Sequence, residues 1–148
     1  MRVNSIRRFL RLPLAVIWRI PEAVVLSACY RYQILHRPFA KIAPAIGISR
    51  LETPEDPASA QVFAIKKAVE VVCKRMPWSC TCLVRALTAK KMLNRRGMGC
   101  TLYMGVAKDA AGKMEAHAWL RCGDCYVTGG DGSAEYAVTA IYGDGRRT

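Results

Sequence analysis

The spacing of apolar residues along this chain changes at Gly97. Before Gly97, apolar residues recur every three or four positions, which is the period of an α-helix. After it, they alternate with polar residues, which is the period of a β-strand with two different faces. Helices followed by strands predict an α+β fold in which a helical hairpin packs on an antiparallel sheet. An apolar content of 52% in 148 residues is enough for one real core.

The first helix of the hairpin is expected over residues 58–75. Its apolar side chains follow the helical period and should face the core; they are Val62, Ile65, Ala68, Val69, Val72 and Cys73. Asp56 followed by Pro57 favours a helix start here, because an aspartate can cap the helix and a proline suits its first position. Met76-Pro77-Trp78 ends the helix and forms the corner of the hairpin.

The second helix, residues 79–97, begins beside a cysteine. Ser79 or Thr81 can cap its first turn, and Gly97 can close it in a left-handed conformation. Cys82 then lies in the first turn, where the partial positive charge of the helix end favours thiolate over thiol. Such a cysteine can act as a nucleophile, although packing as a small buried apolar residue explains it about as well.

Four strands are expected after Gly97, at residues 100–107, 115–122, 125–128 and 136–142. Gly123-Asp124 forms the two-residue turn between the second and third strands. His117 falls in the middle of the second strand, while the other histidine, His36, lies in the N-terminal part of the chain. An imidazole next to a thiol can take its proton and later protonate a leaving amine. Cys82 and His117 are therefore candidates for a nucleophile and its base.

The net charge of +12 is uneven, because residues 1–41 carry eight Lys and Arg against a single acid, Glu22. Residues 1–40 are expected to form one or two short amphipathic helices that break near Pro21 and either pack on the domain or dock a partner. A basic balance suits an acidic peptide, a membrane surface or nucleic acid. No nucleic-acid-binding motif accompanies it, so nucleic acid is not expected as a partner.

The proline-rich segment Leu51–Pro57 is the clearest linker, and it divides the chain into an N-terminal helical segment, residues 1–50, and a catalytic domain, residues 51–148. The longest uncharged runs before it, residues 12–18 and 23–30, are far shorter than the ~20 residues that span a bilayer. Membrane contact is therefore not expected. The seven cysteines are an odd number and fall in predicted helices and strands, which favours reduced thiols and a cytoplasmic location.

Two other interpretations of the cysteines stay open. Cys80 and Cys82 together with Cys122 and Cys125 could supply four thiolates to a structural zinc ion. The Cys122–Cys125 spacing also occurs in redox motifs, but its place on a hairpin turn favours two cysteines that face each other across the turn. A peptide-binding module without catalysis would explain the basic N-terminal segment but would leave the Cys/His pair unused. The preferred interpretation has no metal and no cofactor.

A family resemblance assigns a more specific role to the Cys82/His117 pair. The run Cys82-Leu83-Val84-Arg85-Ala86-Leu87, the Arg95-Arg96-Gly97 helix end, Tyr103-Met104-Gly105-Val106 and Ala116-His117-Ala118-Trp119 together resemble the leader peptidases of lasso-peptide biosynthesis. That family belongs to the transglutaminase-like, papain-related cysteine proteases. The resemblance covers roughly residues 60–142. The Arg- and Leu-rich N-terminal segment and Pro38-Phe39 also resemble the short, separately encoded form of the protease, which lacks a fused leader-recognition domain.

The resemblance implies a cytoplasmic enzyme that removes the leader from a ribosomally made precursor peptide. Its partners would be the precursor peptide, a small separate leader-recognition protein and an ATP-using cyclase that closes the freed core. By motif, Cys82 is the nucleophile and His117 the base, while Cys80 is only a neighbour. The backbone N–H of Cys82 should belong to the oxyanion hole. A transglutaminase-type acyl transfer to an amine would use the same residues, so it stays an alternative.

The third catalytic residue is where this sequence departs from the family. The resemblance implies an aspartate about a dozen residues after the histidine, and Gly129 stands there. Continuing the pairing of Cys122 with Cys125 would place Gly130 opposite His117. Asp131 is the nearest carboxylate, and a bulge at Gly129-Gly130 could turn it inward. We therefore expect Asp131 as the third member, or else a backbone carbonyl, since either can fix the histidine tautomer.

Overall fold

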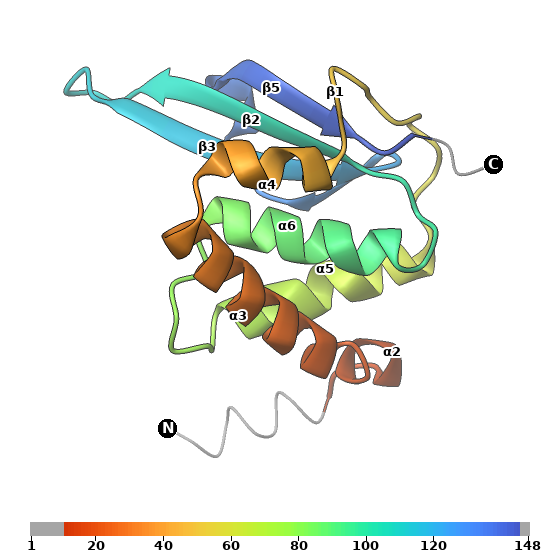
Figure 1. Ribbon diagram of the computed structural model, residues 1–148. Helices are drawn as coiled ribbons and strands as arrows, with labels where there is room; N and C mark the ends of the chain where they lie inside the picture. Colours follow the sequence, from red (N-terminus) through yellow and green to blue (C-terminus); the bar gives the residue numbers. More distant parts are fainter. Residues whose placement is uncertain (1–10, 146–148) are drawn as a thin grey trace.

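A computed structural model describes residues 11–145, and within them one antiparallel sheet has the strand order β1-β5-β2-β3-β4. The strands are β1 (Ile48–Ser49), β2 (Thr101–Lys108), β3 (Met114–Cys122), β4 (Cys125–Thr128) and β5 (Ala137–Gly143). The helices are α2 (Leu14–Ile17), α3 (Ile20–His36), α4 (Phe39–Ile46), α5 (Ala60–Cys73), α6 (Cys82–Asn94) and the 3-10 turn η1 (Ser133–Glu135). The helices gather on one face of the sheet (Figure 1). This arrangement confirms the expected α+β fold.

Helix α5 buries all six of the side chains expected to face the core. Its expected start at Asp56-Pro57 is wrong, because the N-cap is Ser59. The backbone before it is held against the β3–β4 turn: the Asp124 N–H donates to the Asp56 carbonyl at 2.9 Å, and the Asp124 carboxylate accepts from the Ala58 N–H at 2.8 Å. These contacts keep residues 56–58 extended, so the helix begins only after them.

Helix α6 is capped by Thr81, whose hydroxyl accepts from the Val84 N–H at 3.4 Å. Gly97 follows the helix with a positive φ of 74°, as expected for a left-handed cap. Its buried side chains, among them Leu87, Met92 and Leu93, pack between α5 and the sheet. Helices α5 and α6 therefore form the expected hairpin, which brings the start of α6 under the end of the sheet.

The four longer strands lie where the alternating pattern predicts them, within one or two residues at each end. The expected turn at Gly123-Asp124 is confirmed, since Cys122 pairs with Cys125. The expected register beyond it is wrong. A bulge makes Leu120 pair with Thr128, and β4 ends at Thr128 before it reaches the level of His117. No ladder residue therefore stands opposite His117 on this side.

The N-terminal helices break at Trp18-Arg19, because Pro21 suits the first turn of a helix and begins α3 rather than interrupting it. Within residues 11–145, no helix is long and apolar enough to cross a membrane. The division expected between residues 50 and 51 stays a prediction. Residues on both sides nevertheless share one core, because Ala23, Ile42 and Ile46 pack with the α5–α6 hairpin, and β1 pairs with β5.

The segment expected as a linker has no regular structure, but it is fastened to the face of the sheet away from the helices. The buried Arg121 guanidinium donates to the carbonyl of Thr53 at 2.8 Å and to that of Gly123 at 2.8 Å. The hydroxyl groups of Thr53 and Thr101 are hydrogen-bonded to each other at 2.8 Å. These bonds satisfy a buried cation and cover this face of β3.

Candidate active site

Cys82 is the first residue of α6, as its position after a capping threonine predicts. Its side chain is half-buried and packs at the edge of the core. The N–H groups in the first turn of a helix have no partner within the helix. Here Thr81 accepts hydrogen bonds from the N–H groups of Val84 and Arg85. Among the described residues, the N–H groups of Cys82 and Leu83 have no such acceptor. The Cys82 sulfur therefore lies at the positive end of the helix dipole, next to N–H groups that can receive a negative oxygen.

His117 lies in β3, paired with Gly105 of β2. Ala118 and Leu120 belong to the core beneath the sheet, so alternation along the strand turns His117 and Trp119 to the other face. The imidazole stacks beside the Trp119 ring at 5.7 Å and the Tyr136 ring at 4.9 Å between centroids. A Cβ at position 105 would come within 2.9 Å of the Trp119 ring, so this cluster needs the glycine.

The imidazole is held by a backbone carbonyl. Nε2 of His117 lies 2.8 Å from the carbonyl oxygen of Gly129. A carbonyl can only accept, so Nε2 carries the hydrogen and Nδ1 of the neutral ring keeps a lone pair. Gly129 stands at the position where the resemblance implies an aspartate, and its backbone supplies the contact that the missing side chain would make.

Asp131, the carboxylate expected to orient His117, makes no hydrogen bond to it among the described residues. It is exposed in the turn after β4, and the hydrogen bond at Nε2 is made by Gly129. The bulge that was expected at Gly129-Gly130 lies instead inside β4, and Gly129 leaves the strand with a positive φ of 65°. The chain therefore presents a carbonyl to His117 rather than a carboxylate. The geometry matches the second of the two sequence-based alternatives.

Cys82 and His117 come from two elements that pack against each other, α6 and β3, but Cys82 packs with the core beneath the sheet and His117 faces the other side. Within residues 11–145, no hydrogen bond joins their side chains directly. Tyr136, just before β5, packs on the His117 ring, and the charge of Cys82 acts on its phenol. Partial burial raises the pKa of its phenol, and the charges of Glu115, Glu135 and Cys82 raise it further. The sequence gives no signal for Tyr136, because it follows an irregular turn that no pattern predicts.

Cys80 has a different environment from Cys82. It faces Cys73, which ends α5, and burial together with a hydrogen bond and the charge of Cys80 raises the pKa of the Cys73 thiol to about 12. The carbonyl of Cys80 accepts from the Arg85 guanidinium at 3.1 Å. Cys80 thus belongs to the corner between α5 and α6. This agrees with the sequence motif, which implies that Cys80 is only a neighbour of Cys82.

The zinc interpretation does not fit the structure. The Cys122 thiol donates to the Gly99 carbonyl at 3.4 Å, beyond the C-terminal end of α6. Cys80 and Cys82 lie at the other end of this 13-residue helix, roughly 18 Å away at ~1.5 Å per residue. No group of three or more His, Cys, Asp or Glu side chains in the described part of the chain could hold a metal ion. All seven cysteines are free thiols.

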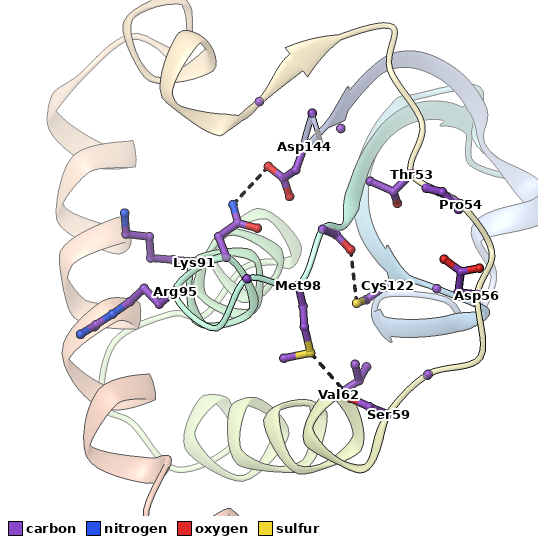
Figure 2. Close-up of a pocket in the computed structure, with 18 of the residues that line it drawn as sticks. Thr53, Pro54, Asp56, Ser59, Val62, Lys91, Arg95, Met98, Cys122 and Asp144 are labelled. Carbon is purple, nitrogen blue, oxygen red and sulfur yellow. Dashed lines mark hydrogen bonds between the residues drawn. The ribbon is translucent and has the colours of Figure 1, made fainter. Parts of the chain in front are cut away.

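Two hollows open on the surface. One, of about 740 Å³, lies at the C-terminal end of α6, where Lys91, Arg95, Asp56 and Asp144 surround it (Figure 2). It is separated from Cys82 by the length of α6. The other, of about 770 Å³, runs between α5 and β4 and reaches Gly129. The second hollow therefore adjoins the residues that hold His117.

One comparison with known proteins bears on this site. A protein-family model described as the transglutaminase-like superfamily matches residues 26–141, which include Cys82, His117 and Gly129. Neither the curated proteins nor the solved structures give a significant match.

Proposed function

Because the chain belongs to the transglutaminase-like superfamily, we propose that it is a cysteine peptidase that removes the leader from a ribosomally made lasso-peptide precursor. The superfamily includes cysteine peptidases and acyltransferases. The finer assignment rests on the CLVRAL and AHAW motifs around Cys82 and His117. The observation that carries it is the placement of Cys82 at the start of α6, with His117 fixed by the Gly129 carbonyl on the neighbouring strand.

In this proposal Cys82 attacks the carbonyl at the leader–core junction. Nδ1 of His117 takes the thiol proton, while its Nε2–H stays on Gly129. The backbone N–H of Cys82 receives the oxyanion. Cys82 packs with the core on the helix side of the sheet, whereas His117 faces the other side. The proposed proton transfer therefore requires the start of β3 to turn the imidazole toward the thiol when substrate binds.

Collapse of the tetrahedral intermediate breaks the peptide bond. The proton on Nδ1 passes to the leaving nitrogen, so the core departs with a free amino terminus, and the leader remains as a thioester on Cys82. His117 then activates a water molecule, which hydrolyses the thioester and restores the thiol. The freed amine is the group that an ATP-using cyclase would consume in forming a macrolactam.

The partners follow from the same proposal. The chain resembles the separately encoded form of the protease, so a small leader-recognition protein would bring the precursor to it. Acyl transfer to an amine is the alternative reaction. It differs only in the group that attacks the thioester, since water yields a free leader acid and an amine yields a leader amide.

Mass spectrometry of a precursor peptide incubated with its leader-recognition protein and this chain tests the proposal. We expect one cut at the leader–core junction, lost in Cys82→Ala and kept in Cys80→Ala. A leader amide formed with an added amine, without the free leader acid, would replace the peptidase by an acyltransferase. If the precursor stays intact while the Cys82 thiol is free, the proposed function is wrong.

A further inference from the structure

Helix α3 has two apolar faces, and residues 11–145 bury only one of them. Its inner face buries Ala23 and Ser27 and packs Ile20, Tyr30 and Ile34 against the core. The opposite face carries Val25, Cys29 and Tyr32, all exposed. A surface helix normally places charged side chains on its outer face, so an apolar outer face is unusual and marks a site of interaction.

The exposed apolar residues run along the outer face of α3. Val25 is 61% exposed and Tyr32 64%, and they are seven residues apart, which keeps them on one side of the helix. Cys29, exposed between them, and Leu35, 60% exposed one turn after Tyr32, lie on the same side. We call these four residues the outer stripe.

The segment of the chain that carries the outer stripe is positively charged. Between residues 11 and 41 the cations are Arg11, Arg19, Arg31, Arg37 and Lys41. The acid in this range, Glu22, already pairs with Arg96 at 2.7 Å and with Arg95 at 3.2 Å. A complementary surface therefore needs an apolar ridge with acidic side chains beside it. A second copy of this chain would instead bring positive charge against positive charge, since each carries +12.

The composition of the outer stripe favours a protein over a membrane. Trp, Tyr and Arg are the residue types that carry most of the binding energy in protein interfaces, whereas Lys is depleted there. Four of the five cations between residues 11 and 41 are arginines. The Tyr32 ring is also fixed in place, because it packs on the His36 ring at 4.4 Å, which lowers the entropy lost on binding.

Helix α3 also connects the outer stripe to the catalytic corner. Trp78, in the loop that leads into Cys82, donates from Nε1 to the Ser27 hydroxyl on the inner face of α3 at 3.2 Å. A partner on the outer face is thus one helix diameter, roughly 10 Å, from that loop. Figure 1 shows α3 lying across α5 and α6 on the side away from the sheet.

We propose that the outer stripe is the docking surface for the leader-recognition protein, and that this protein presents an acid-flanked apolar ridge to it. The inference rests on the proposed function for the identity of the partner. Docking on α3 would hold the leader close to the α5–α6 corner, so that the junction with the core reaches Cys82.

The test measures binding of the purified leader-recognition protein by calorimetry, with Cys82→Ala present in every chain so that catalysis has no influence. Val25→Ser/Tyr32→Ser removes two exposed side chains of the stripe without opening the core. We expect its dissociation constant to rise about 30-fold or more. Ile48→Ser/Met114→Ser, a control with similar exposure on the sheet, should bind like the parent chain, and circular dichroism checks that all variants are folded.

Three results would overturn the proposal. In the first, the stripe variant binds the leader-recognition protein as tightly as the control. In the second, the stripe variant keeps its partner but loses binding to vesicles that contain phosphatidylglycerol, which makes the stripe a membrane contact. In the third, ultracentrifugation shows a dimer that the stripe substitutions dissociate, which makes the occupant a second copy. Cleavage of the precursor by the chain with Cys82 intact is measured separately, so failure of the peptidase proposal is distinguishable from failure of the docking.

Discussion

The carbonyl oxygen of Gly129 lies 2.8 Å from Nε2 of His117, at the place in the chain where the sequence resemblance implies an aspartate. An orienting group fixes which imidazole nitrogen holds the proton, and a carbonyl can do this as well as a carboxylate. A carboxylate would in addition stabilise the imidazolium that forms when the thiol loses its proton. In the proposed reaction a neutral carbonyl offers less of that stabilisation, so more of it would have to come from the N-terminal end of α6, where Cys82 lies.

Asp131→Asn should leave the rate of leader removal within about twofold of the parent chain, because Asp131 is exposed and does not hold His117. His117→Gln should reduce the rate by about 10³-fold or more, since the general base is lost. Both rates are measured by single-turnover cleavage of a precursor peptide. A loss of about 10⁴-fold in Asp131→Asn, the size seen when a triad aspartate is neutralised, would make Asp131 the third member after all.

Gly129→Ala should weaken both stability and activity. Gly129 has a φ of 65°, and an added Cβ would lie 2.7 Å from the Ala118 carbonyl oxygen and 3.1 Å from Nε2 of His117. Backbone strain and displacement of the carbonyl should destabilise the fold by about 1–3 kcal/mol and lower cleavage per folded molecule about tenfold or more. The measurements are urea unfolding and single-turnover cleavage.

Gly132→Ala is the matched control for this change. Gly132 has a similar φ of 76° in the same turn, but nothing lies within 4 Å of the added Cβ. It should cost about 1 kcal/mol in stability and leave cleavage per folded molecule unchanged. Equal losses of activity in the two variants would show that the turn as a whole, and not the Gly129 carbonyl, supports the site.

The sequence suffices to place Cys82 and His117 because each depends on a local pattern. A capping threonine fixes the start of α6, and the strand-like run of residues 115–122 places His117 in β3. The contact between His117 and Gly129 depends instead on a bulge in β4. No local residue pattern in β4 marks the position of that bulge.

Two other elements escape sequence reasoning for a similar reason. Helix α4 contains Pro44, which argues against a helix when taken alone. Burial of Ile42 and Ile46 outweighs that local preference. The segment at Thr53 resembles a free linker by its prolines, yet the buried Arg121 fastens it to the sheet. Long-range packing decides both cases.

Stability should fall at alkaline pH because of buried thiols. Burial, with the hydrogen bond and charge of Cys80, raises the pKa of Cys73 from 9.0 to about 12, and burial likewise raises the pKa of Cys100 and Cys122. Between pH 9 and 12 the unfolded chain loses thiol protons that the folded chain keeps, so unfolding becomes easier as pH rises. Each such thiol contributes up to about 1.4 kcal/mol per pH unit. Below pH 9 the thiols are protonated in both states and the effect disappears.

Urea unfolding between pH 8 and 10.5, in the presence of a reductant, measures this slope. Cys73→Val removes one of the buried thiols, and the slope should then become shallower by about 1 kcal/mol per pH unit above pH 9.5. Cys29→Ala, at an exposed position, should leave the slope unchanged. Parallel curves for the parent chain and Cys73→Val would mean that Cys73 ionises equally well in the folded state.

The ion pair between Lys90 and Asp144 should respond unequally to removal of its two members. Their charged atoms lie 2.8 Å apart, and Lys90 is only 3% exposed while Asp144 is 19% exposed. Asp144 also accepts from the Cys100 N–H at 3.0 Å and from the Asn94 amide at 3.2 Å. Asp144→Ala therefore leaves a buried ammonium without its carboxylate and two other donors unpaired, which should cost about 3–5 kcal/mol.

Lys90→Met should cost less, about 1–2 kcal/mol, because the aspartate keeps its two other donors and some contact with water, and methionine fills the buried volume. Denaturant unfolding of the two variants checks this order, and equal or reversed costs would contradict it. The pair lies at the end of α6 opposite to Cys82, so cleavage per folded molecule should stay unchanged in both. A specific loss of cleavage in Lys90→Met would show that the two ends of α6 are coupled.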